Sequence, residues 1–493
     1  MPPSKTRKIL FVSAEIDPFH KAGGLADVSR ALPLQLKKRG HDIRVVMPLH
    51  NSVERDFKDQ LELVVEKATV RFGNDYINYS IWKGMLEDKI PAYFIDNQGY
   101  FAQRKDPYNY VDDNNRYAFF ARAVLELPKY IDWYPEVIHS NEWATGGIPL
   151  YFQKVYWEDE NYKDTVNVFT IHNLFYQGPP DRVVKRDDEI DKGGRIPAFD
   201  SPQFQLVNFL KRAINNTDAI TAVSEQYAKE ILTKEYGGLL VDDLNKQKDR
   251  LFGIMNGIEY GKFDPAADTN IYTNYSLETL DKKVENKLAL QKEFKLKVDK
   301  DVPLLTFVGR WWGQKGFSLI NKILPYLLKC DVQVFLVGEG DPRFHRSVIN
   351  LHKKYKDKLA VYDHFSVEYG QKAYAAGDMF LLPSRYEPAG LVQLFALHYG
   401  SIPIVRAVGG LVDSVKNYDP VKETGNGFVF KGFNAFDFYA AIVRALEIYK
   451  FKDKWRKLQE YGMKQDLSWK TAAKKYEEVY EFALKNPRRR IKP

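Results

Sequence analysis

Cysteine is nearly absent from this chain, because Cys330 is the single one among 493 residues. One cysteine excludes an internal disulfide framework and any zinc site built on cysteine. Cys330 lies beside an apolar run, which predicts a core residue. The sequence also lacks an uninterrupted apolar run long enough to span a bilayer, so no membrane partner is expected.

The N-terminal stretch, MPPSKTRKILFVSAE, lacks the apolar core and the small-residue cleavage site of a signal peptide. It has basic residues but passes directly into a strand pattern. We therefore expect a cytoplasmic protein.

Signatures of metal and dinucleotide binding are missing as well. No His/Glu cluster has the spacing of metal ligands. The Asp-x-Asp motif, Asp299-Lys300-Asp301, precedes its predicted strand, which is the wrong end for a metal that binds a nucleotide sugar. GEGDPR supplies only the first two glycines of a Gly-x-Gly-x-x-Gly fingerprint. We expect neither a metal nor a cofactor.

The charge is weakly basic, with 73 basic and 65 acidic residues and a net charge of +8. The positive residues are scattered, except in the tail PRRRIKP, so no nucleic-acid partner is expected. A small excess suits a protein that binds anionic small molecules such as nucleotide diphosphates. A solvated surface with a basic tail explains the charge equally well.

The pattern of apolar runs predicts an α/β protein. A chain of 493 residues is too long for one ordinary core, which favours two large domains. Apolar runs alternate with amphipathic stretches almost from end to end, as in KILFVSAE, HDIRVVMP, PEVIHSN and VNVFTIHN, and later in PLLTFVGR, VQVFLVGEG, DMFLLPSR and SIPIVRAV. Because these runs are continuously apolar, they indicate buried parallel strands with helices on both faces of each sheet.

A turn-rich segment at residues 254–270 marks the junction of the two predicted domains, 1–260 and 261–460. The remainder, 461–493, contains SWKTAAKKYEEVYEFAL, which predicts an exposed amphipathic helix with Ser468 as its N-cap. The polar section DRVVKRDDEIDKGGRIP predicts an excursion from the first domain.

Two glycine pairs occur in matching contexts, in FHKAGGLADV (Gly23 and Gly24) and RAVGGLVDSV (Gly409 and Gly410). Each follows an apolar run and precedes a helix pattern, whereas the Gly-Gly-Leu of EYGGLL does not. Backbone at such a pair approaches a ligand closely, and the following helix N-terminus favours an anion. The two pairs therefore predict a ligand held between facing sheets, with one pair presenting N–H groups from each side.

Four motifs, KAGGLADV, TIHNLFYQG, VGRWWGQKG and PSRYEPAGLVQLFALHYGSIPIVRAVGGLVDSV, resemble those of bacterial and plant glycogen/starch synthases. The resemblance runs from about residue 7 to 480. It implies a retaining glucosyltransferase with the glycosyltransferase-B architecture, in which two Rossmann-like domains face each other across the active-site cleft. It also implies a C-terminal helix that crosses back to the first domain.

The resemblance implies a nucleotide-sugar site in which Lys21, Gly23 and Gly24 contact the donor and Arg310 and Lys315 contact its phosphates. Cations there neutralise a diphosphate leaving group without a metal. An exposed loop lysine and a surface arginine are the alternatives.

Further residues follow from the same motifs. Glu387 would contact the transferred glucose, although a carboxylate at a helix N-terminus is the alternative. The loop AVGGLVD, which contains Leu411, would hold the sugar and the distal phosphate. Asp27 and Asp413 each lie in the first turn of the helix predicted after a glycine pair. Asp27 is predicted to bind substrate and Asp413 is not, and helix capping is the alternative role for both.

The resemblance also assigns residues around the glucose and the base. His172 would face the donor glucose beside Asn173, and Asn256 and Lys287 match positions in the substrate site. Phe365 matches an aromatic that packs against the base, and an ordinary core phenylalanine is the alternative.

One departure from the family pattern concerns Glu142-Trp143-Ala144, where the family commonly has Asp-Trp-His. The carboxylate moves by one methylene and the histidine is lost, which affects the geometry on the acceptor side.

The expected reaction is transfer of glucose from ADP-glucose to the non-reducing 4-hydroxyl of an α-1,4-glucan such as glycogen or starch. UDP-glucose as donor, a small acceptor, and a catalytically impaired glucan-binding protein remain as alternatives. The oligomeric state is not readable from the sequence.

Overall fold

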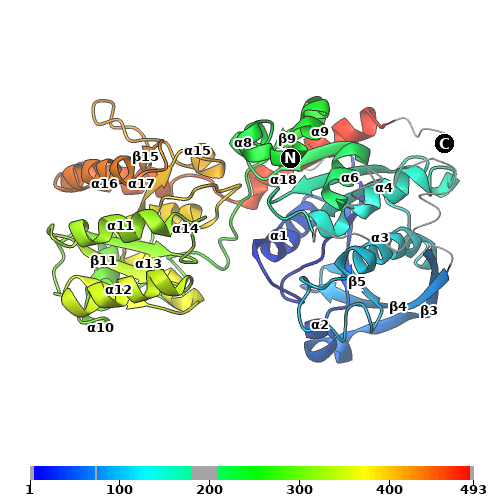
Figure 1. Cartoon of the computed structure of the whole chain (residues 1–493), viewed down its shortest axis with the longest axis horizontal. Helices are drawn as coiled ribbons and strands as arrows, with labels where there is room; N and C mark the ends of the chain where they lie inside the picture. Colours follow the sequence, from blue (N-terminus) through cyan, green and yellow to red (C-terminus); the bar gives the residue numbers. More distant parts are fainter. Residues whose placement is uncertain (1–4, 73–74, 179–207, 489–493) are drawn as a thin grey trace. The chain divides into compact units, whose positions relative to one another are not determined.

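The computed structural model describes residues 5–72, 75–178 and 208–488. The chain forms two compact units (Figure 1). The first comprises Met1–Val223, Ala228–Ile254 and Ala472–Pro493, and the second comprises Ser224–Tyr227 and Met255–Thr471. The predicted excursion at residues 181–197 lies outside the described residues.

The first unit contains a nine-stranded sheet in the order β3-β4-β5-β2-β1-β6-β7-β8-β9. From β5 to β9 all neighbours are parallel, as the continuously apolar runs predict. Its strands are β1 (Lys8–Val12), β2 (Asp42–Pro48), β3 (Glu62–Phe72), β4 (Asp75–Leu86), β5 (Ile90–Asp96), β6 (Val137–Asn141), β7 (Val166–Ile171), β8 (Ala219–Ala222) and β9 (Leu251–Gly253).

Helices flank this sheet, and several short 3-10 turns join the elements. The helices are α1 (Gly24–Lys38), α2 (Asn51–Asp56), α3 (Asp113–Tyr130), α4 (Gly147–Lys154), α6 (Phe209–Asn216), α7 (Glu225–Glu230), α8 (Lys234–Gly237), α9 (Val241–Lys246) and α18 (Trp469–Lys485). The first residues of α7 group with the second unit.

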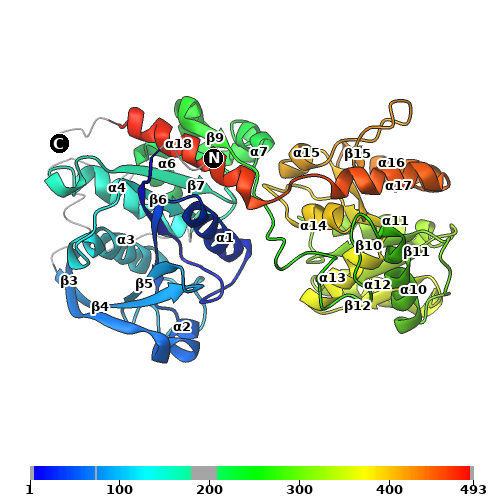
Figure 2. The same cartoon turned by 180° about the vertical axis from the view of Figure 1, so that it is seen from behind.

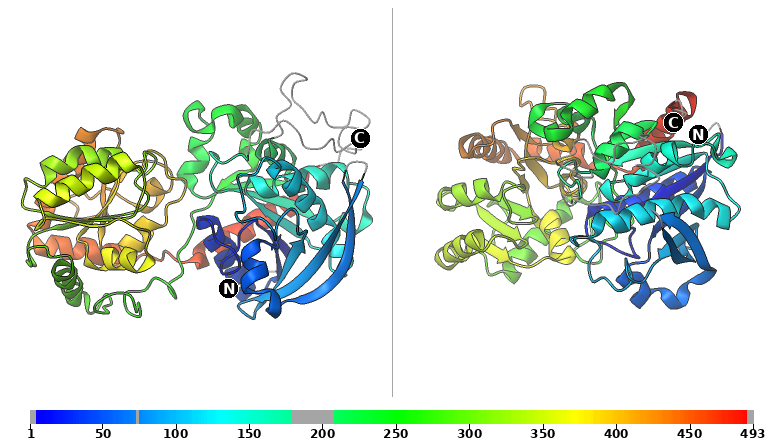
Figure 3. Two further views of the ribbon diagram at one scale, coloured as in Figure 1. Left: turned by 60° about the horizontal axis from the view of Figure 1, so that its bottom comes forward. Right: turned by 45° about the vertical axis from the view of Figure 1, so that its right-hand side comes forward.

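β3 and β4 depart from the expected parallel pattern. They pair antiparallel with each other, β4 pairs antiparallel with β5, and the two long strands extend one edge of the sheet (Figure 3). Much of β3 is exposed, and buried positions alternate with exposed ones toward its end. Such alternation is typical of an antiparallel strand with one solvated face.

The second unit contains a six-stranded, fully parallel sheet in the order β12-β11-β10-β13-β14-β15. Helices lie on both of its faces (Figure 3, left). The elements are α10 (Lys283–Glu293), β10 (Leu304–Val308), α11 (Phe317–Leu327), β11 (Gln333–Val337), α12 (Pro342–Lys354), β12 (Leu359–Tyr362), α13 (Val367–Ala376), β13 (Met379–Leu382), α14 (Val392–His398), β14 (Ile402–Arg406), α15 (Gly410–Ser414), β15 (Phe428–Phe430), α16 (Ala435–Tyr449) and α17 (Lys452–Met463).

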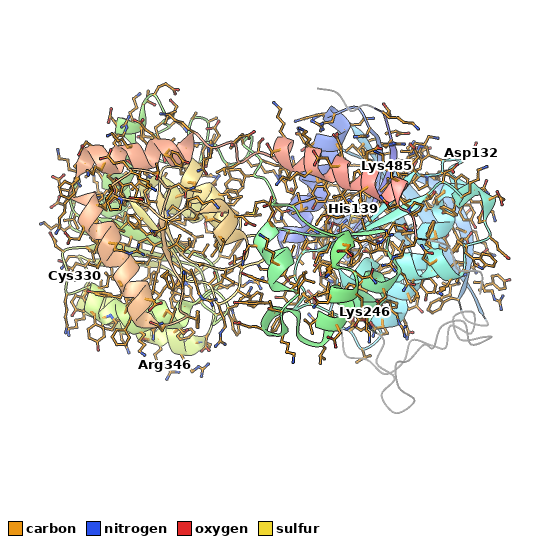
Figure 4. The ribbon with its side chains drawn as sticks, turned by 90° about the horizontal axis from the view of Figure 1, so that it is seen from above. Asp132, His139, Lys246, Cys330, Arg346 and Lys485 are labelled. Carbon is orange, nitrogen blue, oxygen red and sulfur yellow. The ribbon has the colours of Figure 1, made fainter. Side chains whose placement is uncertain are left out.

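Cys330 lies at the edge of the core of the second unit, not inside it as predicted. Its side chain is half-buried and packs against a cluster that includes Leu327 and Leu328. Figure 4 shows it at the periphery of this unit. The residue lies three positions after the last residue of α11.

The C-terminal helix α18 lies against the first unit (Figure 2). Ser468 precedes it and accepts a hydrogen bond from the Lys470 amide at 3.3 Å, in agreement with the predicted N-cap. The expectation of an exposed helix is wrong, because one face, including Tyr476 and Tyr480, is fully buried. Spacing of three to four residues between apolar positions is what lays them on one face.

Candidate active site

In the first unit, β1, β6 and β7 are neighbours, so the loops that follow them lie at one edge of the sheet. The loop after β1 carries Lys21 and Gly23 and leads into α1 at Gly24. The loop after β6 begins with Glu142, and the loop after β7 begins with His172. The fold thus brings to one edge predicted residues that are as many as 151 positions apart in the sequence, Lys21 and His172. Carboxyl ends of parallel strands are where ligands bind in open α/β sheets.

The loop after β1 is held by Glu15, a residue that the sequence analysis missed. Its carboxylate is buried and accepts hydrogen bonds from the amides of Ala22 at 2.7 Å and Gly23 at 2.9 Å. The Tyr108 hydroxyl donates to its other oxygen at 2.7 Å. The Gly23 N–H therefore serves the loop itself, which corrects the expectation that it faces a ligand. A glutamate directly after a buried strand was the available signal.

Around this loop the surface is open. A Cβ atom built on Gly23 or Gly24 meets nothing within 4 Å. Lys21 is about half exposed and pairs with Asp27 of the first turn of α1, at 2.5 Å. An exposed ammonium beside an uncrowded glycine pair leaves room for a ligand to approach the backbone.

Glu142 organises the loop after β7. Its side chain is buried, and one carboxylate oxygen accepts hydrogen bonds from the amides of His172 at 2.5 Å and Asn173 at 2.7 Å. Burial raises the pKa of this carboxyl to about 8, against the opposing effect of the amide hydrogen bonds. Its backbone has a φ of +64°, an uncommon conformation for a residue other than glycine.

His172 is held in a neutral form. Burial lowers the pKa of its ring to about 3, and Nε2 lies 3.0 Å from the side-chain oxygen of Asn141. The Asn173 side-chain oxygen accepts from the Phe175 amide at 3.1 Å. A neutral imidazole at this edge offers a hydrogen bond to a sugar hydroxyl without adding charge.

In the second unit, the corresponding edge carries Arg310, Lys315 and Glu387, in the loops after the neighbouring strands β10 and β13. Glu387 is buried, and the Lys315 ammonium lies 2.9 and 2.7 Å from its two oxygens. The Ser384 hydroxyl, which the sequence analysis also missed, donates to Glu387 at 2.9 Å. The Arg310 side chain is exposed.

The second glycine pair differs from the first. Gly409 has a φ of +45°, and a Cβ there would lie 2.0 Å from the carbonyl oxygen of Glu387; on Gly410 it would lie 1.9 Å from that of Ala389. The Gly410 amide donates to the Glu387 carbonyl at 3.1 Å. The amide of Leu411, whose side chain is buried, donates to Val408. This pair therefore packs against the backbone of the Glu387 loop. The expectation that both glycine pairs present N–H groups to the ligand in the same way is wrong.

The structure also places the other predicted residues. Phe365 is 80% exposed, which excludes a core role. Asn256 is buried, and its side-chain oxygen has no donor among the described residues. Lys287 lies at the opposite edge of the sheet, where it pairs with Asp378 at 2.7 Å, so the fold does not bring it to Arg310 and the prediction for it is wrong. The Asp413 carboxylate accepts from the Gln226 amide at 2.9 Å, consistent with a capping role.

Metal-ligand clusters and membrane-spanning helices are both absent from the described part of the chain. No group of three or more His, Cys, Asp or Glu side chains there is arranged to hold a metal ion. Across residues 5–72, 75–178 and 208–488, none of the helices combines the length and apolarity that crossing a membrane requires.

Comparison with protein families matches residues 8–246 to the starch synthase catalytic domain and residues 290–464 to glycosyl transferases group 1. A glycogen synthase of Clostridioides difficile is 43% identical over 480 residues, covering 96% of this chain and 99% of the relative. One from Thermotoga maritima is 40% identical over 483 residues, covering 97% and 99%.

Solved structures are similar over the whole chain. The catalytic domain of starch synthase IV from Arabidopsis thaliana, bound to ADP and acarbose, is 30% identical, with a TM-score of 0.85 and coverage of 98% of this chain and 100% of that one. A sucrose-phosphate synthase from Thermosynechococcus elongatus shares the fold at 17% identity and a TM-score of 0.58, covering 96% and 98%.

Proposed function

The chain belongs to the glycogen and starch synthase family of glycosyltransferases, and we propose that it transfers glucose from ADP-glucose to the non-reducing 4-hydroxyl of an α-1,4-glucan. Its two parallel-sheet units are the Rossmann-like domains of the glycosyltransferase-B architecture. The starch synthase that it resembles was solved with ADP and acarbose, a nucleotide and an oligosaccharide, which supports these two substrate classes.

The observation that carries the proposal is the charged cluster at the carboxyl edge of the second unit's sheet. Arg310 is exposed there, while the Lys315 ammonium is fixed by both oxygens of Glu387. A diphosphate that leaves with two negative charges is stabilised by preorganised cations of this kind. In this proposal Arg310 and Lys315 bind the donor's phosphates, and Glu387 holds Lys315 in place and contacts the glucose.

The first unit supports the proposal through neutral and polar groups. His172 is uncharged, and Glu142 fixes the loop that carries it. The Glu142 carboxylate reaches both amides despite its extra methylene, so the departure from the family's Asp-Trp-His leaves this loop held. That observation favours an active enzyme over an impaired glucan-binding protein. Lys21 contacts the donor. Asn256, which belongs to the second unit, offers the substrate a side-chain oxygen that has no donor among the described residues.

We propose further that transfer retains the anomeric configuration through attack on the same face of the sugar. A covalent intermediate needs a free carboxylate close to the anomeric carbon. Lys315 and Ser384 hold the oxygens of Glu387, and loop amides hold Glu142. The C1–O bond to ADP therefore breaks first, the acceptor oxygen bonds to C1, and its proton passes to the departing phosphate.

The test is nucleotide release from ADP-glucose and from UDP-glucose, each with and without glycogen. We expect glycogen-dependent ADP release that falls by at least about 100-fold in Glu387→Ala, as on removal of a preorganised electrostatic group. The matched control is Glu447→Ala, which removes an exposed glutamate of α16 that pairs with Lys450. This variant should retain full activity.

If nucleotide is released from UDP-glucose and not from ADP-glucose, then UDP-glucose is the donor in place of ADP-glucose. Release without dependence on glycogen would favour a small acceptor. A folded protein that binds glycogen and releases neither nucleotide would overturn the proposal and make it a glucan-binding protein.

A further inference from the structure

The second unit holds a cavity of about 360 Å³ far from the cluster around Glu387. Lys300 and Asp301, which precede β10, and Asp378, which precedes β13, contribute to its wall, as do residues of α10 and α17. Arg310 and Glu387 follow those same two strands. A strand of five residues therefore separates the two places, by about 15 Å.

The charges that line this cavity do not balance. Lys287 pairs with Asp378 at 2.7 Å, and Arg456 pairs with Asp281 at 2.6 Å. The cavity wall also contains Lys283, Lys300 and Lys452, against one further carboxylate, Asp301. Within the described residues, none of these three lysines forms an ion pair. With Lys283 protonated, the cavity therefore has a surplus of two positive charges, which matches a dianion.

Lys283 is the innermost of these cations. It is buried, and its ammonium donates to the carbonyls of Tyr374 at 3.0 Å and Ala375 at 2.5 Å, at the C-terminal end of α13. Burial lowers its pKa to about 7, opposed by Asp378 and reinforced by Lys287. An anion in the cavity would favour the protonated form of this lysine.

A second observation points to a ligand at this place. Trp455 lines the cavity and is 4% exposed, and its indole N–H has no acceptor among the described residues. The ring is fixed in position, because it stacks on Phe428 and meets Tyr449 edge to face. A buried donor without an acceptor is unfavourable, and an oxygen atom of a ligand would satisfy it.

We propose that this cavity binds a phosphate dianion, independently of the nucleotide-sugar site. Lys283, Lys300 and Lys452 surround the phosphate. The volume lies within the usual range for small-molecule sites and exceeds what a phosphate alone fills. Inorganic phosphate and a hexose monophosphate both carry a phosphate dianion. The indole donor and the Asp301 carboxylate match the hydroxyl groups of a sugar, so the hexose monophosphate binds more tightly.

The test is calorimetric titration with inorganic phosphate and, separately, with glucose 1-phosphate. Both are titrated into Arg310→Gln protein, in which the nucleotide-sugar site has lost one of its phosphate-binding cations and is weakened equally in every variant compared. The cavity variant adds Lys300→Gln and Lys452→Gln, both at exposed lysines. The matched control adds Lys450→Gln and Lys457→Gln, which remove the same charge from lysines outside the cavity that pair with Glu447 and Glu423.

We expect one binding site in the Arg310→Gln protein, tighter for glucose 1-phosphate. In the cavity variant, the loss of two charge-assisted hydrogen bonds should weaken ligand binding at least about tenfold. The control should bind the ligands as tightly as the Arg310→Gln protein. Equal affinity of the cavity variant and the control would overturn the proposal, as would the absence of saturable binding at millimolar ligand. Tighter binding of inorganic phosphate would overturn the assignment of the sugar.

A second readout covers the case in which the cavity variant fails to fold. In the Arg310→Gln protein, glucose 1-phosphate should slow the chemical acetylation of Lys452 but not of Lys457, measured by mass spectrometry of the same sample. Equal protection of both lysines would overturn the proposal.

Discussion

At the scale of single residues, the pKa of Glu142 has a consequence for stability. The pKa is about 8 in the folded protein, against an ordinary value of 4.5, because burial disfavours the charged form. The folded carboxyl therefore keeps its proton between these two values while the unfolded one loses it. The stability that this group contributes is complete below about pH 4.5 and is lost as the pH rises toward 8.

We expect Glu142→Gln to remove this dependence, because the amide oxygen of glutamine accepts the same N–H groups and carries no charge. The advantage of the variant over the wild type in free energy of unfolding should grow by up to about 1.4 kcal/mol per pH unit between pH 5 and 8. Chemical denaturation of both proteins across this range measures it. A difference that stays constant with pH would contradict the raised pKa. Glu447→Gln, at an exposed position, is the control.

The motifs predicted which residues gather at each sheet edge, but not how those residues pair. The Lys315 ammonium pairs with Glu387, and Arg310 follows the same strand as Lys315. The sequence did not reveal that Glu15 takes up the Gly23 amide, because a buried carboxylate finds its partners through the folded loop. The prediction for Lys287 was wrong for a related reason. Which edge of the sheet this side chain reaches depends on how α10 packs.

At the scale of elements, the two glycine pairs follow different physical requirements. Gly409 has positive φ and touches the backbone of the Glu387 loop, whereas Gly23 is extended and faces open space. An L-residue is strained at the first position and unstrained at the second.

We therefore expect Gly409→Ala to lower the free energy of unfolding by about 1–3 kcal/mol. The variant should also displace Glu387 and so reduce glucosyl transfer. Gly23→Ala should unfold like the wild type, and any loss of activity should appear in KM for the donor, because the added methyl projects into open space. Denaturant unfolding and steady-state kinetics measure the two effects. Equal destabilisation by both variants would contradict this distinction.

The parallel strands were predictable because each is a continuous apolar run. The antiparallel strands β3 and β4 were missed for a physical reason. An edge strand with one solvated face has alternating polarity, and a run such as ELVVEKATVRF contains charged residues that interrupt an apolar pattern.

At the scale of the whole molecule, the first unit depends on the end of the chain. Figure 4 shows His139 inside the unit. The Tyr480 hydroxyl lies 2.8 Å from His139 Nδ1. Arg7 and Arg39 pair with Glu481 and Glu477. Periodicity predicted α18 as a helix, but helical spacing alone does not say which sheet its apolar face covers.

We expect Tyr480→Phe to lower the stability of the first unit by about 1–3 kcal/mol, because it leaves the buried His139 ring nitrogen without its partner. The second unit should be unaffected, since α18 from Ala472 onward belongs to the first. Hydrogen exchange resolved by peptide measures the two units separately. The matched control is Tyr461→Phe, at a half-exposed tyrosine of α17, and it should change neither unit. Faster exchange in both units after Tyr480→Phe would mean that they unfold as one, and the helix would then stabilise the whole chain.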